Sequence, residues 1–209
     1  MRVVVMGAAG GVGRRAVEAA VAGGHTVVAA SRAGTAAAEG AEAMSVDVRS
    51  ADAVERAVRD ADAVLWCIGV TRSSGPDVGR VGMAHLVGAA TRAEVGRVVT
   101  VSGAGVTLPS DRKGAGARFV SGLTKRLARD LVTDKEAEHA ALLASSLGWT
   151  EVRPPRLSDG DPTGRWQLTL EAPGLSAKPV PRSDVAAAML SLAVEGGWEH
   201  QSPFITVGG

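Results

Sequence analysis

Apolar residues follow two alternating patterns along the first 150 residues of the chain. Short runs rich in Val and Ala recur, and between them apolar residues return every three to four positions. The runs predict strands at 2–6, 26–31, 44–48, 63–69, 97–102 and 149–153. The helical spacing predicts helices over 12–22, 51–60, 79–93, 117–131 and 133–147, the last beginning with a capping-box pattern at Thr133.

This alternation predicts an α/β fold, a doubly wound parallel sheet with helices on both faces. The pattern changes after residue 102. A glycine-rich loop of functional length follows at 103–116, and strands near 166–170 and 204–207 accompany a helix over 183–194. We expect one domain over 1–209, in which a small C-terminal lobe, about 154–209, completes a substrate cleft.

Composition excludes several classes of protein. The chain has 209 residues, one cysteine and a formal net charge of +1, which argue against a disulfide framework, a cysteine-rich zinc site and bulk attraction to nucleic acid or membranes. Neither a signal peptide nor a membrane span is expected, so a cytoplasmic protein is predicted. Tyrosine is absent from the sequence, which excludes any mechanism that uses a tyrosine acid.

The densest group of glycines lies between the first strand and the first helix. Residues 7–13 read GxxGxxG, a spacing that allows a sharp turn and a close approach of backbone to pyrophosphate at a helix N-terminus. A structural turn is the alternative, but the strand–loop–helix context predicts a Rossmann-like dinucleotide site. The loop residues expected to bind it are Gly7, Ala9, Gly10, Gly11, Val12 and Gly13.

The end of the second strand predicts which dinucleotide binds. NAD-specific sites usually carry an acid there, whereas this strand ends in Ser31 and Arg32. Arg32 can pair with a 2′-phosphate, Ser31 can donate a hydrogen bond to it, and Arg14 can add charge. Solvated arginines are the alternative. We expect NADP(H), with Cys67, Ile68 and Gly69 forming a wall of its site and Cys67 chemically inert.

Most of the chain resembles the atypical short-chain dehydrogenases of the NAD(P)H-binding type. It resembles above all the branch with biliverdin-IXβ reductase/flavin reductase and the nitrogen-metabolite-repressor-like proteins. The resemblance rests on 7–13, Arg32, Asp47, Val101 and Ser102, VTDK at 132–135, SLGWT at 146–150, RPPRLSD at 153–159, TG at 163–164 and RSDVA at 182–186.

The resemblance implies roles for further residues. Asp47, followed by Val48, would contact the adenine amine, unless it only caps a turn. Lys135 would bond the nicotinamide ribose, unless it lies at a surface helix start, and Pro154 would lie beside the cofactor.

The register of the family's catalytic Tyr-x-x-x-Lys places Leu131 where the tyrosine is expected. Alcohol–ketone oxidation is therefore disfavoured, because leucine carries no proton to transfer. Ser102, at the end of the fifth strand, would bond the acceptor or the nicotinamide, or cap the strand end. Ser102 and Lys135 are the candidate catalytic residues.

The substrate side is less defined. Arg156 stands where the flavin reductase pattern has histidine, so it would neutralise an acidic group of the substrate or else be solvated. The basic residues Arg118, Lys125, Arg126 and Arg129 predict a solvated face, with an anionic pocket wall or partner surface as the alternative. The four histidines show no metal-ligand spacing, so no metal is expected.

Together these features predict an NADPH-dependent oxidoreductase that transfers hydride to a flavin, tetrapyrrole or quinone-like acceptor. Its expected partner is a small molecule, with flavin a possible substrate, and the chain is expected to be a monomer or homodimer. A non-enzymatic NADP(H)-binding redox sensor is the main alternative. A sugar-nucleotide epimerase-like enzyme is disfavoured by the missing tyrosine.

Overall fold

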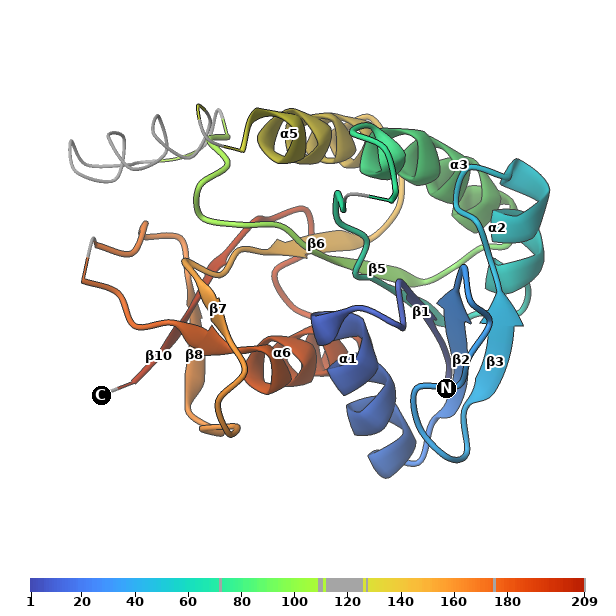
Figure 1. Cartoon of the computed structure of the whole chain (residues 1–209), viewed down its shortest axis with the longest axis horizontal. Helices are drawn as coiled ribbons and strands as arrows, with labels where there is room; N and C mark the ends of the chain where they lie inside the picture. Colours follow the sequence, from blue (N-terminus) through green and yellow to red (C-terminus); the bar gives the residue numbers. More distant parts are fainter. Residues whose placement is uncertain (72, 109–110, 112–125, 127, 175, 209) are drawn as a thin grey trace.

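A parallel sheet of six strands forms the centre of the computed structural model, which describes the chain except for residues 72, 109–110, 112–125, 127, 175 and 209 (Figure 1). The strand order is β3-β2-β1-β4-β5-β6. The strands are β1 (Arg2–Met6), β2 (Thr26–Ser31), β3 (Glu42–Ser45), β4 (Ala63–Trp66), β5 (Arg97–Val101) and β6 (Trp149–Val152). The order reverses between β1 and β4, and ligands bind at such a switch point in doubly wound sheets.

Helices cover both faces of this sheet, as the sequence predicts. One face packs against α1 (Gly11–Ala22) and α6 (Arg182–Glu195), which also contact each other. The other face packs against α2 (Ala51–Val58), α3 (Val78–Arg92) and α5 (Arg129–Leu143) (Figure 1). Within the described ranges, every helix is too short or too polar to cross a membrane.

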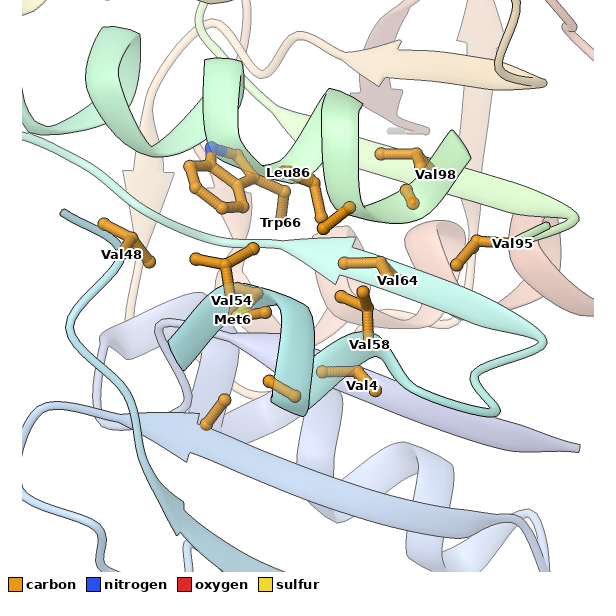
Figure 2. Packing of buried hydrophobic residues seen from close by; sticks show 14 of the residues in the cluster. Val4, Met6, Val48, Val54, Val58, Val64, Trp66, Leu86, Val95 and Val98 are labelled. Atoms are coloured by element: carbon orange, nitrogen blue, oxygen red, sulfur yellow. The ribbon is translucent and has the colours of Figure 1, made fainter. Parts of the chain in front are cut away.

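The core on the α2–α3 face is built from alternate residues of the buried strands (Figure 2). Trp66 is fully buried in it, close to Leu86 of α3 and to Val48. A Cβ at Gly82 would lie 2.8 Å from both Trp66 and Val48. Only glycine therefore lets α3 approach the indole this closely.

In the described part of residues 154–209, which the sequence predicts as a C-terminal lobe, four short strands are present. β8 (Trp166–Thr169) and β10 (Phe204–Val207) pair antiparallel, near the positions that the sequence predicts. The parallel pair β7 (Leu157–Ser158) and β9 (Val180–Pro181) was not predicted, because two residues carry no periodicity. Asp184 of α6 ties the lobe down by accepting the N–H and hydroxyl of Thr163 and the N–H of Gly164.

The predicted break between two helices near residue 132 is wrong. Thr133 does not cap a helix, because α5 already begins at Arg129. The acid that follows, Asp134, accepts from the backbone N–H groups of Gly79 (2.9 Å) and Arg80 (2.8 Å) at the start of α3. The polar pattern thus stabilises a neighbouring helix rather than its own. Most of the helix predicted at 117–131 lies outside the described residues.

Two predicted strands are displaced or too long. β3 is paired over Glu42–Ser45, and Val46 and Val48 are buried because the chain passes into the core after the strand ends. β4 ends at Trp66 rather than at Gly69, although the Cys67 N–H still donates to the Met6 carbonyl. The apolar residues beyond these two strand ends, Val46, Val48 and Ile68, lie at the carboxyl-end edge of the sheet.

Candidate functional site

A groove of about 350 Å³ opens at the carboxyl ends of β1, β2 and β4, where the strand order reverses. Ten of the predicted cofactor residues line it: Gly7, Ala9, Gly10, Ser31, Arg32, Asp47, Val48, Cys67, Ile68 and Gly69. The remaining predicted cofactor residues, Gly11, Val12, Gly13, Ser102, Lys135 and Pro154, are not part of this lining.

The glycine loop is shaped by close backbone contacts. Gly7 has φ +83°, a conformation that side chains disfavour, and its N–H donates to the Ala30 carbonyl at 2.9 Å. A Cβ at Gly13 would collide with the Gly7 carbonyl. Helix α1 begins at Gly11 with Gly10 as its N-cap, and neither a side-chain cap nor an acid is present in its first turn. Its N-terminal N–H groups therefore suit an anion.

Arg32 lies at the β2 end of the groove. Its guanidinium donates to the carbonyl of Ser73 at 2.8 Å and to the Ser73 hydroxyl at 2.9 Å. The neighbouring Ser31 hydroxyl is buried, lines the groove, and has no hydrogen-bond partner among the described residues. A phosphate beside the ribose would fit both groups, which makes this end of the groove suitable for NADP(H).

The other two polar groups predicted for the cofactor differ in position. Asp47 lines the groove and also accepts the Arg49 N–H at 3.0 Å, so turn capping and ligand contact are compatible. Arg14 is more than half exposed, lies 3.9 Å from Glu18 on its own helix, and is not in the groove lining.

Cys67 forms part of the groove wall. Burial of its thiol raises the pKa to about 12 and outweighs the opposing charge of Lys135. The thiol therefore stays protonated at neutral pH, and a thiolate nucleophile is not formed.

Lys135 is buried at the back of the groove wall, so the surface-helix alternative is wrong. Its ammonium donates to the Ile68 carbonyl at 2.7 Å and to Glu138 Oε2 at 2.9 Å. The indole N–H of Trp66 donates to the same Glu138 oxygen at 3.1 Å. Lys135 is thereby fixed to a backbone segment that lines the groove.

Glu138 is an unusual member of this cluster. Burial raises its pKa to about 7, only partly opposed by the charge and hydrogen bond of Lys135. Its second oxygen, Oε1, is buried without a hydrogen-bond partner in the described structure. A Cβ at Gly79 would overlap that oxygen, so glycine is needed where α3 crosses α5.

Leu131 lies one helical turn before Lys135 on α5 and is 39% exposed. It carries no proton to transfer at the position where the family resemblance leads us to expect a tyrosine. Ser102 follows β5, and its buried hydroxyl lacks a hydrogen-bond partner in the part of the chain described. Its N–H donates to the Val152 carbonyl, and Ala104 donates to the Pro154 carbonyl, both at 2.9 Å. Pro154 therefore supports the loop after β5.

Arg156 is not among the residues that line the groove. It is exposed, and its guanidinium donates to the Ala177 carbonyl at 2.9 Å. On the predicted basic face, Arg118 and Lys125 lie outside the described residues, whereas Arg126 and Arg129 are exposed. Among the residues described, no cluster of His, Cys, Asp and Glu has a geometry that could hold a metal ion.

Sequence reasoning missed the loop that closes the groove after β4. Thr71, Ser73 and Ser74 line it, and Ser73 binds Arg32. The sequence signal that could have indicated this loop is the group of hydroxyl residues that follows the buried strand β4. The sequence placed Arg182 in the family resemblance without a role. Its side chain packs where a Cβ of Gly11 would lie, and it pairs with Asp159 at 2.7 Å.

Comparison with known proteins identifies solved structures of the same fold. ChuY, an anaerobilin reductase from Escherichia coli O157:H7, is 26% identical, with a TM-score of 0.79 over 99% of this chain and 97% of that one. A wide-type short-chain dehydrogenase/reductase from Veillonella parvula, solved with NADP, is 19% identical, with a TM-score of 0.80 over 100% and 95%.

A Streptococcus pneumoniae protein to which NADH-flavin reductase activity has been ascribed is 20% identical, with a TM-score of 0.73 over 100% of both chains. The search of curated protein sequences gave no significant match. A family model described as NAD(P)H-binding matches residues 7–195. With its Rossmann-like sheet and the groove at the switch point, the chain belongs to the NAD(P)H-binding family.

Proposed function

We propose that the protein is an NADPH-dependent reductase that transfers hydride to a flavin, tetrapyrrole or quinone-like acceptor. The observation that carries the cofactor choice is the pair at the end of β2, Arg32 and Ser31. The Ser31 hydroxyl has no hydrogen-bond partner among the described residues, and the sequence has no acid at that strand end. Names of similar proteins, an anaerobilin reductase and an NADH-flavin reductase, support acceptors with extended conjugated rings.

Different residues of the groove suit different parts of the dinucleotide. The glycine loop and the α1 N-terminus suit the pyrophosphate, Arg32 and Ser31 suit the 2′-phosphate, and Asp47 suits the adenine amine. Lys135, held through the Ile68 carbonyl, fixes the wall on the nicotinamide side. When bound, the cofactor supplies a hydride, and the protein contributes mainly the position of the donor carbon relative to the acceptor.

The proton for reduction has no tyrosine source, since Leu131 occupies that register and the sequence contains no tyrosine. The Cys67 thiol, with a pKa of about 12, is a poor acid at neutral pH. We therefore assign the proton to water or to the acceptor itself. The buried Ser102 hydroxyl has no hydrogen-bond partner among the described residues, so we assign it one hydrogen bond to the bound acceptor or nicotinamide, a role that orients rather than ionises.

A redox sensor is the second candidate function. It is favoured by Leu131, which removes the family's proton donor while leaving the dinucleotide groove intact. A sensor would bind the dinucleotide and change its partner with the redox state, without turnover.

The two functions are separated by anaerobic NADPH oxidation with flavin mononucleotide, biliverdin and menadione as acceptors. The reductase proposal predicts multiple turnovers with at least one acceptor, and weaker turnover with NADH. Tight NADPH binding without turnover of any acceptor would support the sensor. Absence of NADPH binding would contradict both.

A further inference from the structure

The loop after β4 brings hydroxyl groups into the dinucleotide groove that the proposed function does not use. Thr71, Ser73 and Ser74 line the groove, and none of them lies in a helix or a strand. The N–H of Thr71 donates to the Ser74 hydroxyl at 2.8 Å, and the N–H of Ser74 donates back to the Thr71 carbonyl at 3.2 Å. These two bonds tie Thr71 to Ser74 on either side of Ser73.

Arg49 anchors the same loop from outside the groove lining. Its guanidinium donates to the Ser74 carbonyl at 3.0 Å and pairs with Asp77, the residue before α3, at 2.5 Å. The loop is thus held by bonds in which Arg32 takes no part. A long arginine side chain has more rotamer freedom to lose than a tethered turn. In the contact between Ser73 and Arg32, Ser73 is therefore the fixed partner and Arg32 the group that is oriented.

Arg32 keeps its positive charge available in this contact. It donates from one terminal nitrogen to the Ser73 carbonyl at 2.8 Å and from the other to the Ser73 hydroxyl at 2.9 Å. Both acceptors are neutral, and no acid pairs with Arg32 among the described residues, whereas Arg49 is neutralised by Asp77. A guanidinium has five N–H donors. An anion in the groove would therefore meet an oriented cation that still has donors to offer.

Two hydroxyls accompany this cation. The Ser31 hydroxyl is buried, lines the groove and has no hydrogen-bond partner in the described structure, and a buried hydroxyl without a partner costs free energy. The Ser73 hydroxyl already accepts from Arg32, so its own proton remains for the Thr71 hydroxyl, 3.3 Å away, or for a ligand. A phosphate offers acceptors to both hydroxyls and a countercharge to Arg32, whereas a ribose hydroxyl carries no charge.

We propose that Ser73 is a specificity-determining residue, which holds Arg32 for the 2′-phosphate of the dinucleotide and donates its hydroxyl proton to that phosphate. The inference rests on the proposed use of NADPH, and it adds a residue on which the choice of NADPH over NADH depends. Changes at Ser73 should alter the preference between the two dinucleotides rather than the binding of both.

The test is calorimetric titration of the full chain with adenosine 2′,5′-bisphosphate and adenosine 5′-monophosphate, which differ only in the 2′-phosphate. Wild type should bind the bisphosphate at least about tenfold more tightly. Ser73→Ala should reduce this preference by about two- to tenfold, the scale of one hydrogen bond. Ser73→Asp places an acid beside Arg32 and should abolish the preference, while affinity for the monophosphate changes by less than about twofold. Ser146→Asp, exposed and outside the groove lining, is the matched control and should keep the wild-type preference.

Three results would overturn the proposal: an unchanged preference in both Ser73 variants, an equal loss of affinity for both probes, or tighter binding of the bisphosphate by Ser73→Ala. The last result would mean that Ser73 competes with the phosphate for Arg32. A wild-type chain without any preference would contradict NADPH as the cofactor, whereas a preference that survives both Ser73 variants would contradict only the role of Ser73. Because the probes bind without an acceptor, a failure of turnover leaves this inference standing.

Discussion

Replacing Glu138 by Gln tests the electrostatics of the cluster that holds Lys135. The carboxylate is buried, and its pKa is raised to about 7 by burial. The amide has nearly the same shape, still offers an oxygen to Trp66 and Lys135, and cannot ionise. The substitution therefore isolates the charge.

The sign follows from linkage between folding and proton binding. Between the usual value of 4.5 and about 7, the unfolded chain has released this proton while the folded chain keeps it. The stabilisation that the protonated Glu138 contributes is therefore fully present below the pKa of this group in the unfolded chain. It is lost as the pH rises through the pKa of the group in the folded chain. Moving the pKa from 4.5 to about 7 corresponds to about 3 kcal/mol.

Urea unfolding from pH 5 to about pH 8 measures the effect, with the free energy of unfolding taken from circular dichroism. The free energy of unfolding of wild type should fall, relative to that of Glu138→Gln, as the pH rises. The difference between the two proteins should change by on the order of 3 kcal/mol over this range, in favour of the variant. Glu39→Gln, which removes an exposed carboxylate, is the matched control and should run parallel to wild type.

Parallel stability curves for Glu138→Gln and wild type would refute this reasoning. They would mean that the Lys135 ammonium fully compensates the burial of the carboxylate, so that the pair is ionised throughout the range.

Three further substitutions test the dinucleotide groove. Arg32→Asp should weaken NADPH binding more than tenfold, about 2–4 kcal/mol, with little change for NADH in calorimetry, whereas the exposed control Arg59→Asp should change neither. Gly13→Ala should cost roughly 1–3 kcal/mol of stability and abolish NADPH binding, because the added methyl would meet the Gly7 carbonyl. The control Gly88→Ala, within α3 where a methyl meets only the end of the Arg92 side chain, should instead gain about 0.5–1 kcal/mol in the same unfolding assay. Lys135→Met should lower NADPH affinity about tenfold in a fluorescence titration, and undiminished affinity would show that the ammonium has no part in placing the cofactor.

The sequence predicts most of the sheet well because its strands, apart from the exposed edge strand β3, are buried on both faces. Such strands appear as apolar runs with little else in them, as in β1, β2 and β5. The glycine loop was equally predictable, since backbone sterics leave few residue choices at Gly7 and Gly13. These features are determined by local rules.

Features that depend on contacts between distant elements were not predictable. The polar run after Leu131 has the form of a local cap, but Asp134 caps α3, which lies 55 residues earlier in the chain. The burial of Lys135 follows from the same packing of α5 on α3. Likewise, nothing local indicates that Ser73 would bind Arg32 across the groove.

The central claim, hydride transfer without a side-chain acid, is tested most directly by single-turnover reduction of a flavin with NADPH deuterated at the transferred position. The account predicts transfer with a large primary isotope effect. It also predicts that Ser102→Ala slows this transfer only by about 5- to 30-fold, the scale of one lost neutral hydrogen bond, 1–2 kcal/mol. Absence of transfer, or a loss in Ser102→Ala of more than about 1000-fold, would contradict it.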